Sequence, residues 1–402
     1  MSGGSTIDLA TAQQANAQGM AALRIGDHGA AIAAFTRATA ADPSAIPLWS
    51  NLAHAFRLSG DGVGERFALE RALSIDRTDF APQLRMAQLL QRLGEGGLGE
   101  ETAALQAWSG AFQLAAQLPA LAPAIEAEIA AGKAYCDHLQ ARIEARLDAA
   151  FDPLRGDWDE SERRRITAFV DRALGRRAIY HNECAGLHYP FLPADEYFDR
   201  KHFDWLGELE AHTGVIRAEL DALLASPDEV MRPYVRMDEG TPQNLWSALD
   251  HSLDWSACFL WEYGAPHQAI LDRCPGTAAL LERLPLARIP GRAPNAFFSL
   301  LRPHTRIPPH TGVTNTRAIV HLPLDIPPGC GFRVGGETRA WVEGKAFAFD
   351  DTIEHEAWND SDRRRAVLIV DTWNPHLTMR ERDAIVRYTD MADHALAAPT
   401  AK

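Results

Sequence analysis

Apolar side chains recur at two different spacings along the chain, and the spacing changes near residue 290. In the N-terminal part they return every three or four positions, as at Ala31, Phe35 and Ala38, which predicts amphipathic helices. Beyond residue 290 they form short runs between Pro-, Gly- and Asp-rich breaks, which predicts strands and turns. The predicted strands are 297–301, 318–324, 331–334, 338–342, 346–349 and 366–372. The 402 residues therefore divide into an all-α region and a β-rich region, about two domains.

The N-terminal region repeats one turn at a fixed spacing. Gly26-Asp27, Gly60-Asp61 and Gly94-Glu95 are 34 residues apart, and each follows a segment with helical apolar spacing. Each repeat is therefore predicted to be a helical hairpin. A hairpin of this period resembles a tetratricopeptide repeat, and the resemblance covers about residues 9–112. Three repeats are about the minimum that buries a continuous core.

The helical array is expected to end in a closing helix and to offer a binding surface. The Ala-, Leu- and Glu-rich residues 120–150 are predicted to continue the helical stack and to close it. Stacked hairpins form a concave surface that suits an extended peptide or a protein partner. The same array also serves as a rigid spacer or a dimerisation surface, and its side chains do not identify a ligand.

Two histidines mark the edges of predicted strands in the β-rich half. His310 follows a Pro-Pro pair, and His355 ends the run that begins at Asp350. Imidazole suits iron, and two histidines with open coordination positions are what a non-haem Fe(II) oxygenase needs. Many short, closely spaced strands are typical of a sandwich or barrel of the jelly-roll type. The pattern thus favours a metal site on a jelly roll, although a lone histidine is more often structural.

Four short segments of this half share one family pattern. They are 310–315 (HTGVTN), 343–345 (EGK), 349–356 (FDDTIEHE) and 370–375 (VDTWNP). Together they resemble the aspartyl/asparaginyl β-hydroxylase family of Fe(II)- and 2-oxoglutarate-dependent dioxygenases. The resemblance is strong over 297–376, weaker over 189–292 and absent from the repeats. It implies a double-stranded β-helix of the jelly-roll or cupin-like type with flanking helices.

The resemblance implies that His310 and His355 bind Fe(II). Most related oxygenases have a carboxylate two residues after the first histidine, whereas this chain, like this family, has Gly312. Either water or one of the nearby carboxylates, Asp350, Asp351 or Glu354, then completes the iron site. Asp351 is the preferred candidate to hydrogen-bond a metal-bound water or to orient a ligand.

The resemblance also implies partners for both carboxylates of 2-oxoglutarate. Arg365 is expected to hold the distal carboxylate with Ser299, since a guanidinium binds a carboxylate bidentately. His321 is expected beside the carboxylate nearest the iron. The family's second basic residue, two positions earlier, is replaced by Ile319. Arg317 shares the strand face of Ile319 and His321, so it either takes that role or grips an acidic substrate.

The implied reaction consumes O2 and 2-oxoglutarate and hydroxylates an unactivated carbon. The family name indicates the β-carbon of Asp or Asn residues in a peptide or protein, with the repeats as a docking arm. The alternatives are the same fold acting on a small molecule or lipid, halogenation, and a catalytically silent scaffold protein. Presence of both histidines, Arg365 and Ser299 favours the enzyme.

The predicted domains follow from these patterns. Residues 1–114 form the repeats, 115–165 a helical connector, 166–385 the oxygenase domain and 386–402 a tail. Whether residues 155–176 are a linker helix or part of the oxygenase domain is left open.

Composition excludes several other classes of protein. A formal net charge of −14, without a basic cluster, disfavours nucleic acid as a partner. The five cysteines are odd in number and lack Cys-x-x-Cys spacing, so neither a disulfide framework nor a thiolate zinc site is predicted. No apolar run approaches the roughly 18 residues of a membrane span, and residues 1–8 are polar. A cytoplasmic location is expected.

Overall fold

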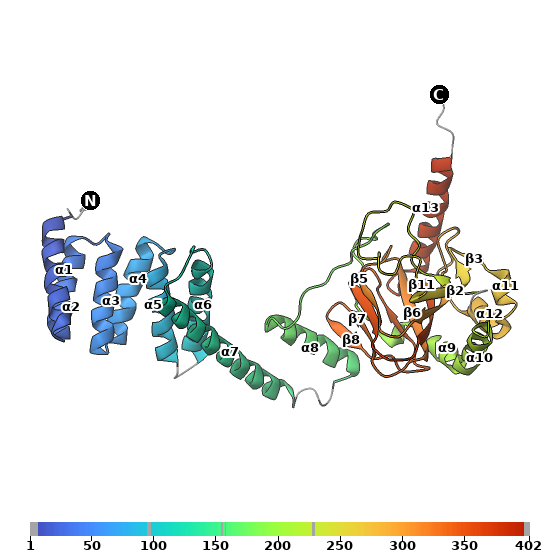
Figure 1. Cartoon of the computed structure of the whole chain (residues 1–402), viewed down its shortest axis with the longest axis horizontal. Helices are drawn as coiled ribbons and strands as arrows, with labels where there is room; N and C mark the ends of the chain where they lie inside the picture. The colour runs from blue at the N-terminus through green and yellow to red at the C-terminus, as the bar shows by residue number, and fades with distance from the viewer. Residues whose placement is uncertain (1–6, 95–97, 154–155, 157, 227–229, 398–402) are drawn as a thin grey trace, which may run out of the picture. The chain divides into compact units, whose positions relative to one another are not determined.

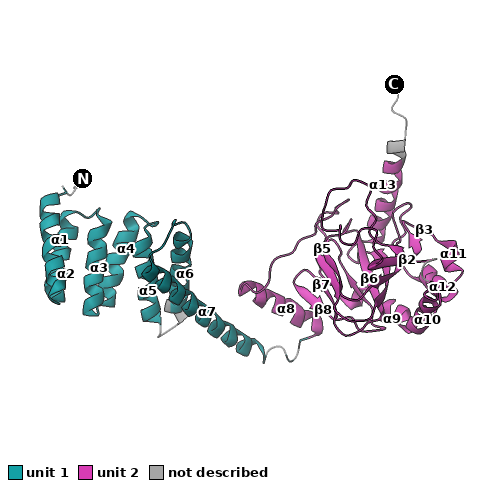
Figure 2. Cartoon of the chain, viewed as in Figure 1, with its two compact units in different colours: residues 1–158 teal, residues 159–402 magenta. Residues whose placement is uncertain are grey.

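The chain forms two compact units, Met1–Trp158 and Asp159–Lys402 (Figure 2). The computed structural model describes residues 7–94, 98–153, 156, 158–226 and 230–397. The predicted boundary at residues 165/166 falls inside helix α8 (Glu160–Ala173), which lies wholly in the second unit. The predicted boundary at 385/386 likewise falls inside helix α13 (Met379–Ala397).

The described part of the first unit is built from three helical hairpins and one long helix (Figure 1). The helices are α1 (Leu9–Arg24), α2 (His28–Ala41), α3 (Ile46–Ser59), α4 (Gly62–Ile75), α5 (Phe80–Leu93), α6 (Leu98–Ala115) and α7 (Pro123–Phe151). Helix α1 packs against α2, α3 against α4, and α5 against α6. The predicted tetratricopeptide-like array is confirmed.

The repeated turn residues account for the hairpins. Asp27 and Asp61 precede the second helix of their hairpins, and each side chain accepts a hydrogen bond of 2.9 Å from a backbone N–H three residues on. Gly26 and Gly60 have φ angles of 76° and 79°, in the left-handed region that glycine tolerates. Glu95 of the third turn lies outside the described residues.

A column of large apolar side chains fills the first unit. Phe35, Leu69, Leu89 and Trp108 are at most 2% exposed. Helix α7 closes the column because Gly132 lies directly against the Trp108 ring, and a Cβ at that glycine would be 2.3 Å from it. The expected closing helix is therefore present.

The described part of the second unit contains two antiparallel sheets. The larger has the order β1-β2-β4-β11-β6-β9, with β3 paired to β2, and the smaller has the order β5-β10-β7-β8. The strands are β1 (Arg232–Pro233), β2 (Trp255–Glu262), β3 (Ala265–Pro266), β4 (Ala296–Leu301), β5 (Thr305–His310), β6 (Arg317–Asp325), β7 (Cys330–Val334), β8 (Glu337–Arg339), β9 (Phe347–Phe349), β10 (His355–Asn359) and β11 (Arg365–Trp373). The predicted jelly-roll-like β domain with flanking helices is confirmed.

The larger sheet separates two cores because successive side chains point to opposite faces. On β11, Leu368 and Val370 face a core shared with helices α9 (Leu206–Ala211), α10 (Thr213–Leu223) and α12 (Pro275–Arg283). Val367 and Ile369 face the other core, between the two sheets. The short helices η3 (Arg200–His202) and α11 (Gln268–Leu271) complete the unit.

All six predicted strand runs overlap observed strands, but some strands were missed. Strand β8 ends at Arg339, three residues before the predicted end at residue 342. Strands β5 and β10 were not predicted, and they carry His310 and His355. Prolines lack the N–H that a ladder needs, so the Pro-Pro pair in β5 resembles a turn. Strand β2 was missed because it precedes the region of strand-like runs.

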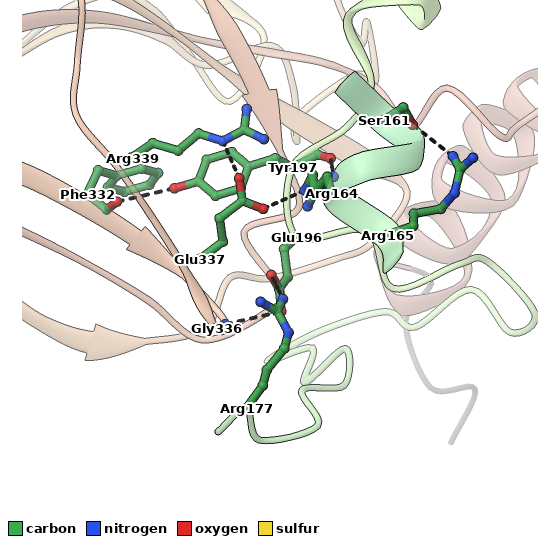
Figure 3. A network of polar contacts seen from close by, with 10 residues as sticks. All are labelled: Ser161, Arg164, Arg165, Arg177, Glu196, Tyr197, Phe332, Gly336, Glu337 and Arg339. Carbon is green, nitrogen blue, oxygen red and sulfur yellow. Dashed lines mark hydrogen bonds and ion pairs between the residues drawn. The ribbon is translucent and has the colours of Figure 1, made fainter. Parts of the chain in front are cut away.

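Polar contacts fix helix α8 to the β domain (Figure 3). Arg164 pairs with Glu337 and donates to the Tyr197 carbonyl oxygen at 2.7 Å. Glu337 also accepts from Arg339 at 2.6 Å, and the Tyr197 hydroxyl donates to the Phe332 carbonyl at 3.2 Å. Within the described residues, α8 is therefore part of the second unit rather than a free linker.

All five cysteines are free thiols. Across the described residues, no helix combines the length and apolar content needed to cross a membrane.

Substitution Gly132→Ala tests the closing contact of the first unit. We expect the free energy of unfolding to fall by about 1–2 kcal/mol, because overpacking against Trp108 outweighs the helix-propensity gain of alanine. Urea unfolding followed by circular dichroism measures this. The control is Gly29→Ala in α2, where the nearest atom would be 3.7 Å from the new Cβ. Equal stability of Gly132→Ala and wild type would contradict the packing described.

Candidate active site

A cavity of about 480 Å³ is lined by residues of both sheets in the second unit. Strands β4, β6 and β11 line it from the larger sheet, and β5 and β10 from the smaller. The cavity brings together all seven residues predicted for the site: Ser299, His310, Arg317, His321, Asp351, His355 and Arg365.

The two predicted metal ligands lie side by side. His310 and His355 are paired across β5 and β10, and their ring centroids are 4.1 Å apart. Nδ1 of each ring contacts a backbone carbonyl, of Pro308 at 2.8 Å and of Ile353 at 3.0 Å. With Nδ1 protonated to donate these bonds, Nε2 of each ring keeps a free lone pair.

Both imidazoles are held in the neutral form that a metal requires. Burial lowers the pKa of His310. Burial and, to a smaller extent, electrostatic interaction with His310 lower the pKa of His355 to about 3. Within the described part of the chain, no group of three or more His, Cys, Asp and Glu side chains is arranged to hold a metal ion. The protein thus offers a pair of imidazoles rather than a full ligand set.

Asp351 occupies the space beside Gly312. A Cβ at Gly312 would be 2.1 Å from Oδ2 of Asp351, and the Gly312 N–H donates to the Asp351 carbonyl at 2.6 Å. Burial raises the pKa of the Asp351 carboxyl to about 7; the Arg317 guanidinium opposes this rise, and Asp350 and Asp371 add to it. A residue with a side chain at position 312 would displace this carboxyl group.

Arg365 is a buried cation without a carboxylate partner among the described residues. It is 1% exposed, and burial lowers its pKa to about 10, so it remains charged at pH 7. Its Nη1 donates to Oγ of Ser299 at 3.2 Å, and its Cζ lies 4.6 Å from the centroid of the Trp341 ring. Its Nε is buried without a hydrogen-bond partner there. A buried guanidinium in this state is a strong site for an anion.

His321 lies deep in the same cavity. The residue is 5% exposed, and its ring centroid lies 4.9 Å from those of both Phe332 and Phe349. Burial, with the nearby Arg365 and His355, lowers the pKa of His321 well below its ordinary value. Its Nδ1 is a second buried atom that has no partner within the described residues.

Arg317 is paired within the protein. It forms an ion pair with Asp371, whose Oδ2 also accepts from the backbone and side-chain nitrogens of Asn295, 3.0 Å each. Burial alone would lower the pKa of Arg317, but the carboxylates of Asp371 and Asp351 hold it above its ordinary value. The two arginines of the cavity therefore differ: the charge of Arg317 is neutralised by Asp371, whereas Arg365 has no carboxylate partner among the described residues.

Sequence reasoning missed part of the cavity wall. Tyr234 stacks on Trp255 with centroids 3.9 Å apart, and Trp246 lies edge-on to His310 at 4.9 Å. The Trp255 indole N–H donates to Ser299 at 3.2 Å. Asp371 could have been predicted from the sequence. It lies an even number of residues after Arg365 on the same strand, so both side chains point to the same face of the sheet.

The chemistry of the cavity fits an iron site beside a dicarboxylate. Two neutral imidazoles present free nitrogens in this cavity. Arg365 and His321 line it too, and their Nε and Nδ1 atoms have no hydrogen-bond partner in the part of the chain that the structure describes. Imidazole nitrogens suit iron, and a guanidinium with a hydroxyl neighbour suits a carboxylate.

Comparison with known proteins agrees with this chemistry. Residues 210–375 match the family model described as Aspartyl/Asparaginyl beta-hydroxylase. The mouse aspartyl/asparaginyl beta-hydroxylase is 42% identical over 134 residues, which are 33% of this chain and 18% of that protein. The ornithine lipid ester-linked acyl 2-hydroxylase of Rhizobium tropici is 34% identical over 196 residues, 48% of this chain and 66% of that protein. The chain thus spans less than a fifth of the mouse relative.

A solved structure resembles the repeats. The TPR2B domain of yeast Sti1, in a complex with pHsp70, aligns with 32% of this chain and 97% of that domain, at 19% identity and a TM-score of 0.28. The matched family segment, by contrast, lies in the second unit and contains the site. The second unit of this chain therefore carries a domain of the aspartyl/asparaginyl β-hydroxylase family.

Proposed function

We propose that the second unit is an Fe(II)- and 2-oxoglutarate-dependent dioxygenase that hydroxylates an unactivated carbon. One observation carries the proposal: a pair of neutral histidines shares a cavity with a buried guanidinium that has no carboxylate partner among the described residues. The first feature suits a metal with open positions, and the second suits a dicarboxylate co-substrate.

Each residue then has a defined task. His310 and His355 would hold Fe(II) through Nε2, because their Nδ1 atoms face backbone carbonyls. Arg365 and Ser299 would bind one carboxylate of 2-oxoglutarate, and His321 the end nearer the metal. Iron, when bound, supplies the activation of O2 that couples oxidation of 2-oxoglutarate to hydroxylation.

Asp351 is proposed to orient a metal-bound water from the space beside Gly312. With a pKa of about 7, its carboxyl is able both to accept and to donate a hydrogen bond near neutral pH.

Arg317 is proposed to contact the substrate rather than 2-oxoglutarate. Its pairing with Asp371 leaves little charge for a second carboxylate of the co-substrate, whereas the pair can orient polar groups of a substrate.

The proposed substrate is an Asp or Asn residue in a peptide or protein, hydroxylated at its β-carbon. The names of the mouse and human relatives support this, at 42% and 41% identity. The Rhizobium relative, matched over a larger share of its length, supports a second candidate, a lipid acyl chain.

The repeats are proposed to dock an acidic stretch of a peptide substrate. Polar side chains of α1, α3 and α5 meet across neighbouring hairpins: Asn51 donates to Asn16 at 2.9 Å, and Arg85 donates to the Ser50 carbonyl at 3.0 Å. Arg57 and Arg85 have no carboxylate partner within the described residues. This leaves two cations for an acidic partner.

Succinate formation tests the enzyme. Protein purified without oxygen is mixed with Fe(II) and 2-oxoglutarate, and succinate is followed after oxygen is admitted. We expect His310→Ala to abolish turnover and Arg365→Ala to raise the KM for 2-oxoglutarate about 10- to 100-fold, because a charge-assisted bond is lost. The matched control is Arg364→Ala, since Arg364 is exposed beside Arg365.

Two outcomes of this assay would contradict the proposal. Equal succinate from wild type and His310→Ala would exclude the histidine pair as the metal site. Absence of both metal and 2-oxoglutarate binding in the wild type would favour the silent scaffold instead.

Gly312→Ala tests the place assigned to Asp351. The new Cβ would displace the Asp351 carboxyl, so we expect succinate formation to fall about tenfold or more, as for other groups that orient metal ligands. Asp351→Ala should lose a similar factor, and the double variant should lose no more than the larger single loss. Unchanged turnover in Gly312→Ala would contradict the close contact of these residues.

Mass spectrometry of reaction mixtures tests the substrate class. Peptides rich in Asp and Asn should gain one oxygen atom, and an acyl lipid should not. Arg57→Ala/Arg85→Ala is expected to raise the KM for an acidic peptide severalfold while leaving uncoupled succinate formation unchanged. Oxygen found in the lipid alone would replace the peptide proposal with the second candidate.

A further inference from the structure

Residues 182–189 form a strap that crosses both segments carrying the predicted metal ligands. The strap precedes the family match, which covers residues 210–375. We propose that it is a positioning element of the metal site, holding the segment 310–315 and the segment 350–355 at a fixed separation. This inference rests on the proposed function, because it assumes that His310 and His355 bind the metal.

At its first residue the strap is tied to the segment of His355. The Asn182 side-chain amide donates to Oδ2 of Asp350 at 2.7 Å and to Oγ1 of Thr352 at 2.9 Å. The Glu183 backbone N–H donates to the Thr352 carbonyl at 2.7 Å. Asp350 and Thr352 are themselves fully buried, so these bonds join the strap to the interior of the domain.

Further along, the strap is tied to the segment of His310. The Ala185 N–H donates to the Gly312 carbonyl at 3.0 Å, and the Gly186 N–H donates to the Val313 carbonyl at 2.8 Å. Asn315, which is 0% exposed, then exchanges two hydrogen bonds with the Tyr189 backbone, at 2.8 and 2.9 Å. The strap therefore continues the pairing of this segment beyond the end of β5.

The sheet alone constrains the two segments weakly at this point. The pairing of β5 with β10 shifts register between His355 and Ala357, and it ends at the pair His355–His310. Past that pair, a bond from the Gly312 N–H to the Asp351 carbonyl joins the segments directly. The strap bonds to Gly312 and Thr352 on either side of this link. Without the strap, the segments beyond the His355–His310 pair would lose the hydrogen bonds that the strap donates to the carbonyls of Gly312, Val313 and Thr352.

A change of this kind is expected to appear in metal affinity. Groups that hold metal ligands in place typically contribute 10- to 100-fold to affinity, although they do not touch the metal. The strap has no residue lining the cavity, so it is expected to influence metal binding only by holding the segments 310–315 and 350–355 in place.

Binding of Mn(II), which needs no oxygen-free handling, tests the strap by calorimetry on the full chain. We expect Asn182→Ala to weaken Mn(II) binding about tenfold. The matched control is Tyr189→Phe, which removes a hydrogen bond of the strap to Glu381 of α13 at 3.0 Å and leaves both metal segments untouched. Its Mn(II) affinity should equal that of wild type.

A second variant guards against loss of folding in the first. The Cβ of Gly186→Ala would be 2.9 Å from Cγ1 and 3.2 Å from the carbonyl oxygen of Val313, so the strap must shift away from Val313. Gly186 is exposed to solvent, so the strap has room to shift outward. We expect weaker Mn(II) binding with a melting temperature close to that of wild type. Wild-type affinity in both folded variants overturns the inference alone. A wild-type chain that binds no Mn(II) overturns the metal site and the strap together.

Discussion

The buried guanidinium of Arg365 is the constraint on which the second unit depends. A charge removed from water without a carboxylate partner is costly, and the described residues offer it one hydroxyl, one carbonyl and the face of Trp341. Its strand is held in place by pairing with a neighbouring strand on each side. An anion that enters the cavity supplies the carboxylate partner that Arg365 lacks. The unpaired cation lowers the stability of the free protein, and pairing it with the anion favours ligand binding. We infer that this is why the cation is kept.

Strand alternation distributes the chemistry of the site. Inward positions of the larger sheet carry Arg365, Ser299 and His321, and the register of β11 sets Ile369 opposite His321 and Val367 opposite Ser299. The smaller sheet supplies the two histidines at the point where its β5–β10 ladder ends. The larger sheet is thus suited to hold an anion rigidly, while the two proposed metal ligands lie where the ladder gives way to loops. Loops at that point need their own supports, and the strap 182–189 provides hydrogen bonds to both.

Much of this organisation follows from local sequence, and the remainder depends on contacts between distant residues. The 34-residue period specifies hairpins because Asp27 and Gly60 act on their own turns. The strand of Arg365 is a continuous apolar run, so its existence and the face of its arginine were predictable. Strand β5 was not, since Pro308 and Pro309 hide it, and neither was the pairing of Arg317 with Asp371, which lies 54 residues away. The strap has no periodic pattern; it is recognised from its hydrogen-bond partners in the segments of the two histidines, which are 126 to 170 residues away.

The central claim is that one cavity holds a metal on two histidines and an anion on Arg365. Calorimetry of 2-oxoglutarate into the Mn(II)-loaded chain tests it most directly, with Arg365→Met and His355→Ala beside the wild type. The account predicts one saturable site in the wild type, loss of most affinity in Arg365→Met with Mn(II) still bound, and loss of Mn(II) itself in His355→Ala. Binding of 2-oxoglutarate that is unchanged in Arg365→Met would contradict it.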